Sequence, residues 1–269
     1  MNIALYNKRK NAILSVCPDA TNIIAPAIKG AQNSMLTAKT ADGEVMFKFN
    51  DYELAQKNVA VSKLYNMRGI PAPQISLHTV GDIHFEMYKK FPQKTLFEAI
   101  QDGMPPEYIK QIYREVLFYF EKMANISPAY INSNLKNTAH EVAKVNVSNV
   151  NNKAIGTLCA AIVYLANISK QSDMALFHSD ITPKNIIVSN DGHLVSFIDM
   201  DNVCVCSKKH AFSMMAAKYH ELGFDVEELM SEYYKVSLEH LPAESIKRRV
   251  SIANLSKKLL WKHSVSKSK

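Results

Sequence analysis

Three residues between Leu176 and Asn202 have side chains that could together carry out phosphoryl transfer. Asn185 follows Asp180 by five positions, and Asp199 stands at the end of a later apolar stretch. A carboxylate such as Asp180 can orient a hydroxyl group and accept its proton, whereas amide and carboxylate oxygens are the ligands that Mg²⁺ prefers. This spacing is typical of a phosphotransferase catalytic loop, in which an aspartate meets the acceptor while an asparagine and a later aspartate hold magnesium.

The elements expected around these residues would bring them together. Three short apolar strands are predicted, at Ala175–Phe177, Asn185–Ser189 and Leu194–Ile198. The Asn190-Asp191-Gly192 sequence between the last two is typical of a hairpin turn. Because Asn185 begins one strand and Asp199 follows the other, we expect their oxygens and those of Asp180 to converge on a single divalent ion.

The first third of the chain predicts a small lobe rich in strands. Apolar runs separated by turn residues predict strands at Asn22–Ile28, Met35–Lys39, Val45–Phe49, Gln74–Thr79 and Ile83–Tyr88. Between them, the recurrence of apolar residues from Tyr52 to Arg68 predicts one helix. The lobe is therefore expected to be a five-stranded antiparallel sheet with one inserted helix.

Helical patterns dominate the remainder of the chain. They begin at Pro105-Pro106 and reach Met123, run again from about Ala154 to Lys170, and resume near Ala211. We expect Cys204-Val205-Cys206 to lie in a loop. The fold class is accordingly α+β, with a β-rich lobe at residues 1–89 and a larger, mostly helical lobe at residues 90–269.

The central segment resembles the aminoglycoside phosphotransferase and choline kinase superfamily, whose fold is bilobal and protein-kinase-like. The matching residues are His178-Ser179-Asp180, Pro183, Asn185-Ile186-Ile187-Val188 and Ile198-Asp199-Met200-Asp201, with Ser179 and Met200 as departures in type. The resemblance implies that Asp180 is the catalytic base and that Asn185 and Asp199 hold the metal. His178 is expected to brace the loop, and Asp201 is either a further metal ligand or an acid paired with a basic neighbour.

The same resemblance extends more loosely to the first lobe and implies a nucleotide site there. Gly30, Asn33 and Ser34 lie in a segment that looks like the family's nucleotide loop, whose backbone N–H groups can face phosphate oxygens. Lys48 stands where family members place a lysine that neutralises phosphates. Glu86 and Tyr88 belong to a segment that looks like the hinge whose backbone pairs with adenine.

The acidic partner that family members provide for this lysine is not evident. The equivalent helix position holds Asn58, while Glu53 lies five residues earlier. Either Asn58 acts as a neutral hydrogen-bond partner of Lys48, or Glu53 takes the role through a shifted helix register.

These observations together predict an ATP- and Mg²⁺-dependent kinase of a small-molecule hydroxyl, with an amino alcohol, a sugar or an aminoglycoside as the class of acceptor. Helices after Asp199 contain residues that could contact the acceptor: Tyr219, Glu221, Phe224, Asp225, Glu228 and Glu232. One alternative is an atypical protein kinase, although Thr182 stands where protein-serine kinases commonly place lysine. Another is a nucleotide-binding pseudoenzyme or adaptor that acts through a basic C-terminal tail.

Composition and charge exclude several other classes of protein. The 269 residues are 47% apolar and include only eight glycines, which favours a globular body over low-complexity or collagen-like chains. The net charge of +7 arises at the end, because residues 247–269 contain eight bases and no acid. Nucleic acid is therefore an improbable partner. Four scattered cysteines and short apolar runs indicate a cytoplasmic protein without a membrane span.

Overall fold

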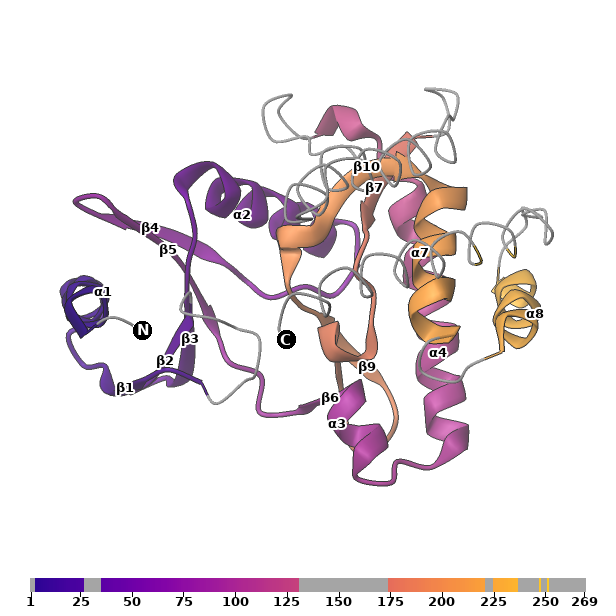
Figure 1. The fold of residues 1–269 in the computed structure, drawn as a ribbon, viewed down its shortest axis with the longest axis horizontal. Helices are drawn as coiled ribbons and strands as arrows, with labels where there is room; N and C mark the ends of the chain where they lie inside the picture. Colours follow the sequence, from indigo (N-terminus) through magenta and orange to yellow (C-terminus); the bar gives the residue numbers. More distant parts are fainter. Residues whose placement is uncertain are drawn as a thin grey trace, which may run out of the picture. The chain divides into compact units, whose positions relative to one another are not determined.

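The structure is a computed structural model that describes residues 3–26, 35–130, 174–220 and 225–236, together with residues 247 and 251. The predicted helix at 154–170 lies outside these residues, as does the predicted nucleotide loop with Gly30, Asn33 and Ser34. Two compact units make up the chain (Figure 1). The N-terminal unit comprises Met1–Lys94 with Ser196–Asp201, and the C-terminal unit comprises Thr95–Val195 with Asn202–Lys269. The first division thus falls five residues after the expected one, and a short later segment joins the N-terminal unit.

The N-terminal unit is built on a five-stranded antiparallel sheet, with the strand order β1-β2-β3-β5-β4 (Figure 1). Its elements are α1 (Ile3–Val16), β1 (Thr21–Ile24), β2 (Met35–Thr40), β3 (Gly43–Phe49), α2 (Tyr52–Met67), β4 (Ser76–Val80) and β5 (Ile83–Lys89). The predicted strands and inserted helix are therefore present. Residue Lys48 of β3 is directly opposite Glu86 of β5, which is the register that builds the site described below.

Local sequence explains where helix α2 begins. The side chain of Asp51 accepts a hydrogen bond from the backbone N–H of Leu54 and so caps the helix. Helix α1, by contrast, was not predicted, because the polar run Asn7–Asn11 interrupts its apolar pattern. Its Ala12 and Ile13 are buried against the sheet in one hydrophobic cluster, so tertiary packing stabilises a helix that its own sequence signals poorly.

The C-terminal unit surrounds the short strands with helices. Its described elements, two of which extend into the N-terminal unit, are β6 (Lys94–Thr95), α3 (Leu96–Gln101), α4 (Pro106–Ala124), β7 (Met174–His178), β8 (Ile186–Val188), β9 (Leu194–Phe197), β10 (Val203–Ser207), α7 (Lys208–His220) and α8 (Val226–Val236). Short 3-10 turns occur at Pro128–Tyr130, Pro183–Asn185 and Met200–Asn202. An aromatic cluster fills the core, where the Phe120 ring lies 4.9 Å from that of Phe177 and 5.8 Å from that of Phe212.

Strand β10 corrects the prediction of a loop at Cys204-Val205-Cys206. It pairs antiparallel with β7, so that Val203 lies opposite His178, and all five of its residues are buried. Because both faces of this strand are covered, its residues form an uninterrupted apolar run without the alternation that identifies a half-exposed strand. The mixed α+β class is confirmed, and no helix among the described residues is long and apolar enough to cross a membrane.

Candidate active site

Lys48 forms the centre of a buried polar cluster in the N-terminal unit. Its Nζ lies 2.6 Å from Oδ1 of Asp199 and 2.7 Å from Oδ2 of Asp201, and only 11% of its side chain is exposed. Asn58 on α2 and Glu86 on β5 complete the group, which we call the Lys48 cluster. The ion pair joins two residues that lie 151 positions apart in the chain.

The backbone of Asp199 has an unusual conformation. Its φ angle is +64°, in the left-handed region that non-glycine residues rarely adopt. Aspartate tolerates this region better than most residues, because its short polar side chain can bind locally. Backbone strain of this kind is retained where surrounding contacts hold it, as the bond from Lys48 does here.

Electrostatics keep Lys48 protonated. Burial by itself lowers the pKa of its ammonium group, but the carboxylates of Asp199 and Asp201 outweigh that effect, and the net result is a raised pKa. An ammonium group has three N–H donors, and the two carboxylates take two of them. A phosphate oxygen could accept the third without loss of either ion pair.

The structure separates the two candidates for the partner of Lys48. Glu53 is exposed on α2, whereas Asn58 is completely buried. Nδ2 of Asn58 donates to Oδ1 of Asp201 at 2.5 Å and to Oε1 of Glu86 at 2.7 Å. Asn58 therefore orients the carboxylate that pairs with Lys48, and Asp201 supplies the negative charge that family members are expected to place on the helix.

Glu86 occupies the middle of β5, with β3 on one side and β4 on the other. Its side chain accepts hydrogen bonds from Asn50 Nδ2 at 2.6 Å and from Asn58, so the side chain as well as the backbone is committed within the unit. Burial raises the pKa of Glu86 to about 7, against the opposing influence of Lys48. Tyr88, two residues further along β5, is partly buried, and burial raises the pKa of its phenol.

In the C-terminal unit, backbone contacts fix the loop that carries Asp180. The N–H and the Oγ–H of Ser179 both donate to the carbonyl oxygen of Asn202, at 3.0 and 2.6 Å. The N–H of Asp180 donates to Nδ1 of His178 at 3.2 Å, and His178 is 98% buried. His178 therefore braces the loop, and the Ser179 hydroxyl adds a second hydrogen bond to the carbonyl oxygen of Asn202.

Asn185 holds the Asp180 carboxylate directly. Its Nδ2 donates to Oδ2 of Asp180 at 2.9 Å and to the backbone oxygen of Asp180 at 3.0 Å. Because the amide nitrogen is used in this way, the amide oxygen is the atom of Asn185 that could bind a metal. Sequence reasoning did not identify Lys218 of α7, whose Nζ lies 3.0 Å from the other carboxylate oxygen of Asp180.

The two expected metal ligands belong to different units: Asn185 to the C-terminal unit and Asp199 to the N-terminal unit. Both have oxygen donors of the type that Mg²⁺ binds together with oxygens of water and phosphate, and the Asp199 side chain remains 35% exposed. Among the described residues, no three His, Cys, Asp or Glu side chains gather as a metal site.

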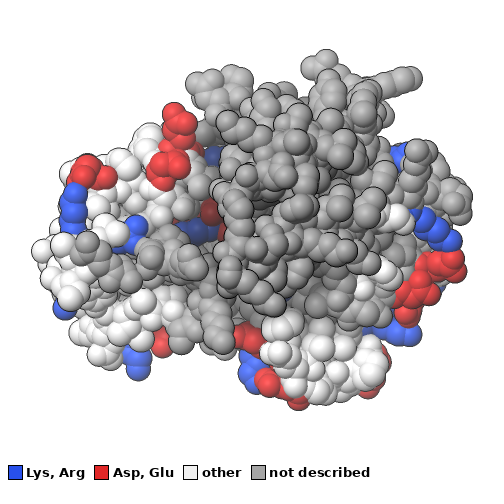
Figure 2. Space-filling view, in the orientation of Figure 1, with Lys and Arg blue, Asp and Glu red and all other residues white. Residues whose placement is uncertain are grey.

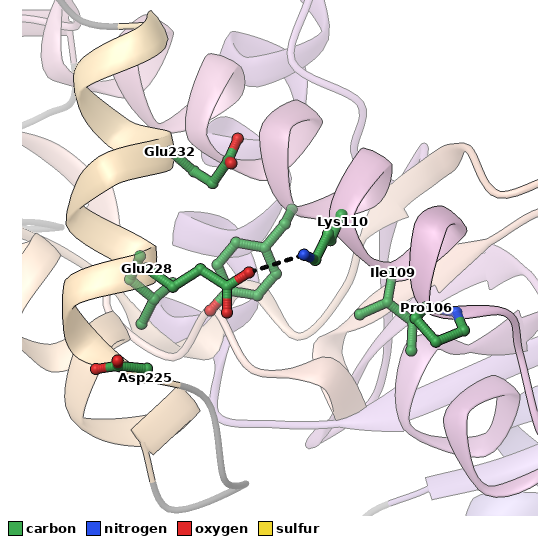
Figure 3. Close-up of a pocket in the computed structure, with 8 residues that line it drawn as sticks. Pro106, Ile109, Lys110, Asp225, Glu228 and Glu232 are labelled. Atoms are coloured by element: carbon green, nitrogen blue, oxygen red, sulfur yellow. Dashed lines mark ion pairs between the residues drawn. The ribbon is translucent and has the colours of Figure 1, made fainter.

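A separate cavity of about 140 Å³ lies between α4 and α8 (Figure 3). Apolar groups of Ile109, Tyr113 and Leu229 line most of it. Two of its acids pair with basic residues of α4: Glu228 with Lys110 at 3.1 Å and Glu232 with Arg114 at 2.7 Å. On the face shown in Figure 2, described acidic and basic side chains likewise lie beside one another without gathering by sign.

Comparison with known proteins identifies the fold. No protein-family model and no curated protein sequence matches the chain. An aminoglycoside phosphotransferase from Streptomyces rimosus is similar with a TM-score of 0.67 at 12% identity, over 93% of this chain and 98% of that one. APH(2″)-IIIa, solved with GDP and kanamycin, gives 0.66 at 11% identity over 97% and 99%. A choline/ethanolamine kinase family protein from Mesorhizobium loti gives 0.59 at 14% identity over 95% and 84%. The chain therefore has the protein-kinase-like fold of the aminoglycoside phosphotransferases and choline kinases.

Proposed function

We propose that this protein transfers the γ-phosphate of ATP to a hydroxyl group of a small molecule, with Mg²⁺ as the metal. The observation that carries the proposal is the ion pair between Lys48 and Asp199. These are the residues that the sequence assigned to phosphate and to metal, and the fold joins them across most of the chain. Similar solved structures that contain GDP or AMP give this proposal further support.

Each residue has a defined task in the proposed reaction. Lys48 would hold phosphate oxygens of the nucleotide, Asn185 and Asp199 would ligate a magnesium ion, and that ion would supply positive charge against the phosphates. Asp180 orients the acceptor hydroxyl, whose oxygen attacks the γ-phosphorus as the bond from that phosphorus to the β-phosphate oxygen breaks. ADP leaves, and the hydroxyl proton passes to Asp180.

The anchoring of Asp180 suits this task. Its backbone N–H, backbone oxygen and one carboxylate oxygen are all held, by His178 and Asn185. A base held in one position lowers the barrier mainly by placing the hydroxyl in line with the bond that breaks. The loose transition state of phosphoryl transfer does not require a strong base.

The proposal is tested by measuring ATP consumption by the full chain with Mg²⁺ against pooled amino alcohols, sugars, aminoglycosides and proteins. We expect turnover with at least one small-molecule pool, and Asp180→Ala should reduce it by about 10²- to 10⁴-fold. Calorimetry should show that Asp180→Ala still binds nucleotide, because Asp180 is not expected to contact it.

Asp191→Asn provides the matched control, since Asp191 is an exposed acid in the turn of the neighbouring hairpin. It should leave turnover unchanged. If Asp180→Ala retained full turnover, Asp180 would have no part in the reaction. If proteins were the pool that accepted phosphate, the small-molecule assignment would be wrong.

A further inference from the structure

Lys218 forms an ion pair with Asp180, the candidate catalytic base. It lies in the last turn of α7, and its Nζ is 3.0 Å from Oδ1 of Asp180. Asn185 holds the opposite oxygen, Oδ2, at 2.9 Å. Both side chains of the ion pair remain partly accessible, with 38% of Lys218 and 29% of Asp180 exposed.

Given the proposed function, in which Asp180 is the base, the ion pair places the positive charge of Lys218 beside the acceptor. A hydroxyl that loses its proton to Asp180 must come within about 2.6–3.2 Å of a carboxylate oxygen. Because each carboxylate oxygen can accept two hydrogen bonds, the hydroxyl can share Oδ1 with Lys218. The atoms next to that hydroxyl then lie roughly 4–6 Å from a full positive charge, a distance at which charges interact strongly near a protein surface.

The rest of α7 has the same sign of charge. It contains no acid; its basic residues are Lys208, Lys209, His210, Lys218 and His220, of which Lys208 pairs with Glu121 at 2.7 Å. On α8, Glu232 pairs with Arg114 at 2.7 Å, and Glu228 pairs with Lys110 as Figure 3 shows. Two carboxylates of α8 are thus matched to cations of the protein, which leaves them less available to an amine-rich acceptor.

We propose that Lys218 selects an acceptor alcohol that carries a carboxylate or a phosphate near its reactive hydroxyl, and that it disfavours polycations. An ammonium group has three donors. One holds Asp180, and the others can bind the anionic group of the acceptor while its hydroxyl rests against Oδ1. The phosphoryl transfer itself is the reaction described above, and Lys218 adds no chemical step to it.

The test compares neutral, anionic and cationic acceptors. The full chain is assayed with ATP and Mg²⁺ against glycerol and glycerate, ribose and ribose 5-phosphate, and choline and kanamycin. We expect the anionic member of a pair to have a kcat/KM at least about tenfold above its neutral partner, with the cations below both. Separate carboxylate and phosphate arms identify the preferred anion.

Variants at position 218 show whether this lysine is responsible. Lys218→Gln should raise the KM of the anionic acceptor about tenfold while that of its neutral partner changes little, and Lys218→Arg should keep the preference. Lys218→Glu should shift the preference toward choline. Lys209→Gln, on the same helix, is the control for charge alone and should leave the ratio unchanged.

The inference and the proposed function fail in different ways. Turnover that is equal for charged and neutral members, fastest with kanamycin, or reduced equally for all acceptors by Lys218→Gln would overturn the inference but not the function. Where no acceptor is turned over, calorimetry measures the binding of glycerol and of glycerate to the protein in the presence of a non-hydrolysable ATP analogue. Glycerate that bound no more tightly than glycerol would overturn the inference independently of activity.

Discussion

Glu86 is a carboxyl group whose charge depends on the fold. It is 98% buried between Asn50 and Asn58, in the same cluster as Lys48 and Asp201. The cost of burying a second carboxylate beside Asp201 favours its neutral form, and the amide donors only partly offset this cost. At the scale of the residue, the Lys48 cluster therefore combines the ion pairs of Lys48 with Asp199 and Asp201 and an acid that titrates near neutrality.

This leads to a prediction about stability and pH. The pKa of Glu86 rises from an ordinary value of 4.5 to about 7 in the folded chain. Below pH 4.5 both states are protonated, and between 4.5 and 7 the unfolded chain ionises first, so the free energy of unfolding falls as pH rises. The total loss from this group is about 3 kcal/mol.

Urea unfolding from pH 4.5 to 7.5 measures the effect. The difference between wild type and Glu86→Gln should change by about that amount over this range, whereas Glu53→Gln, at an exposed site on α2, should not alter the pH dependence. Parallel curves for wild type and Glu86→Gln would show that Glu86 does not titrate as described.

At the scale of the element, the hairpin after Asn185 depends on one glycine. Gly192 has φ +79°, and a Cβ atom there would lie 2.6 Å from the ring of Tyr108. The hydroxyl of Ser189 and the backbone of His193 close the same turn. Glycine is therefore required both by the backbone angle and by the close approach of the α4 side chain.

A matched pair of substitutions separates these two causes. Gly103 also has a positive φ, +84°, but no atom lies within 4 Å of a Cβ placed there. We expect Gly103→Ala to cost about 1 kcal/mol and Gly192→Ala to cost about 2–3 kcal/mol in the free energy of unfolding. Equal losses in denaturant titrations would mean that Tyr108 moves aside without penalty.

At the scale of the whole molecule, charge is distributed very unevenly along the chain. Residues 247–269 contain eight bases, and the remaining residues contain 24 bases and 25 acids. Lys247 pairs with Glu227 at 2.5 Å, which shows that part of this charge is matched by the protein itself. Five lysines follow Ser251, and we expect them to contribute most of any affinity for polyanions.

Replacement of Lys257, Lys258, Lys262, Lys267 and Lys269 by glutamine tests this. The net charge falls from +7 to +2, and the salt concentration that elutes the protein from heparin should fall markedly, because each released counterion contributes to binding. Turnover of ATP should be unaffected. If turnover fell in parallel, the basic end would have a role in the reaction.

The sequence alone predicted much of the local framework. The five-residue spacing of Asp180 and Asn185 predicted a catalytic loop. The strands around Lys48 were predicted correctly, because alternating apolar residues and turn signals act over short distances. It could not predict α1, whose helix depends on packing against the sheet, or β10, whose two covered faces remove the alternating pattern.

Only the tertiary structure decided which side chains meet. Asp201, Asn58 and Glu86 surround Lys48, and Lys218 faces Asp180 from a helix 38 residues later. Sequence spacing determines contacts along one helix or one hairpin, whereas these contacts join segments whose proximity is set by the burial of the core. The sequence thus predicted the chemistry of Asp180, and the fold decided the charge of its surroundings.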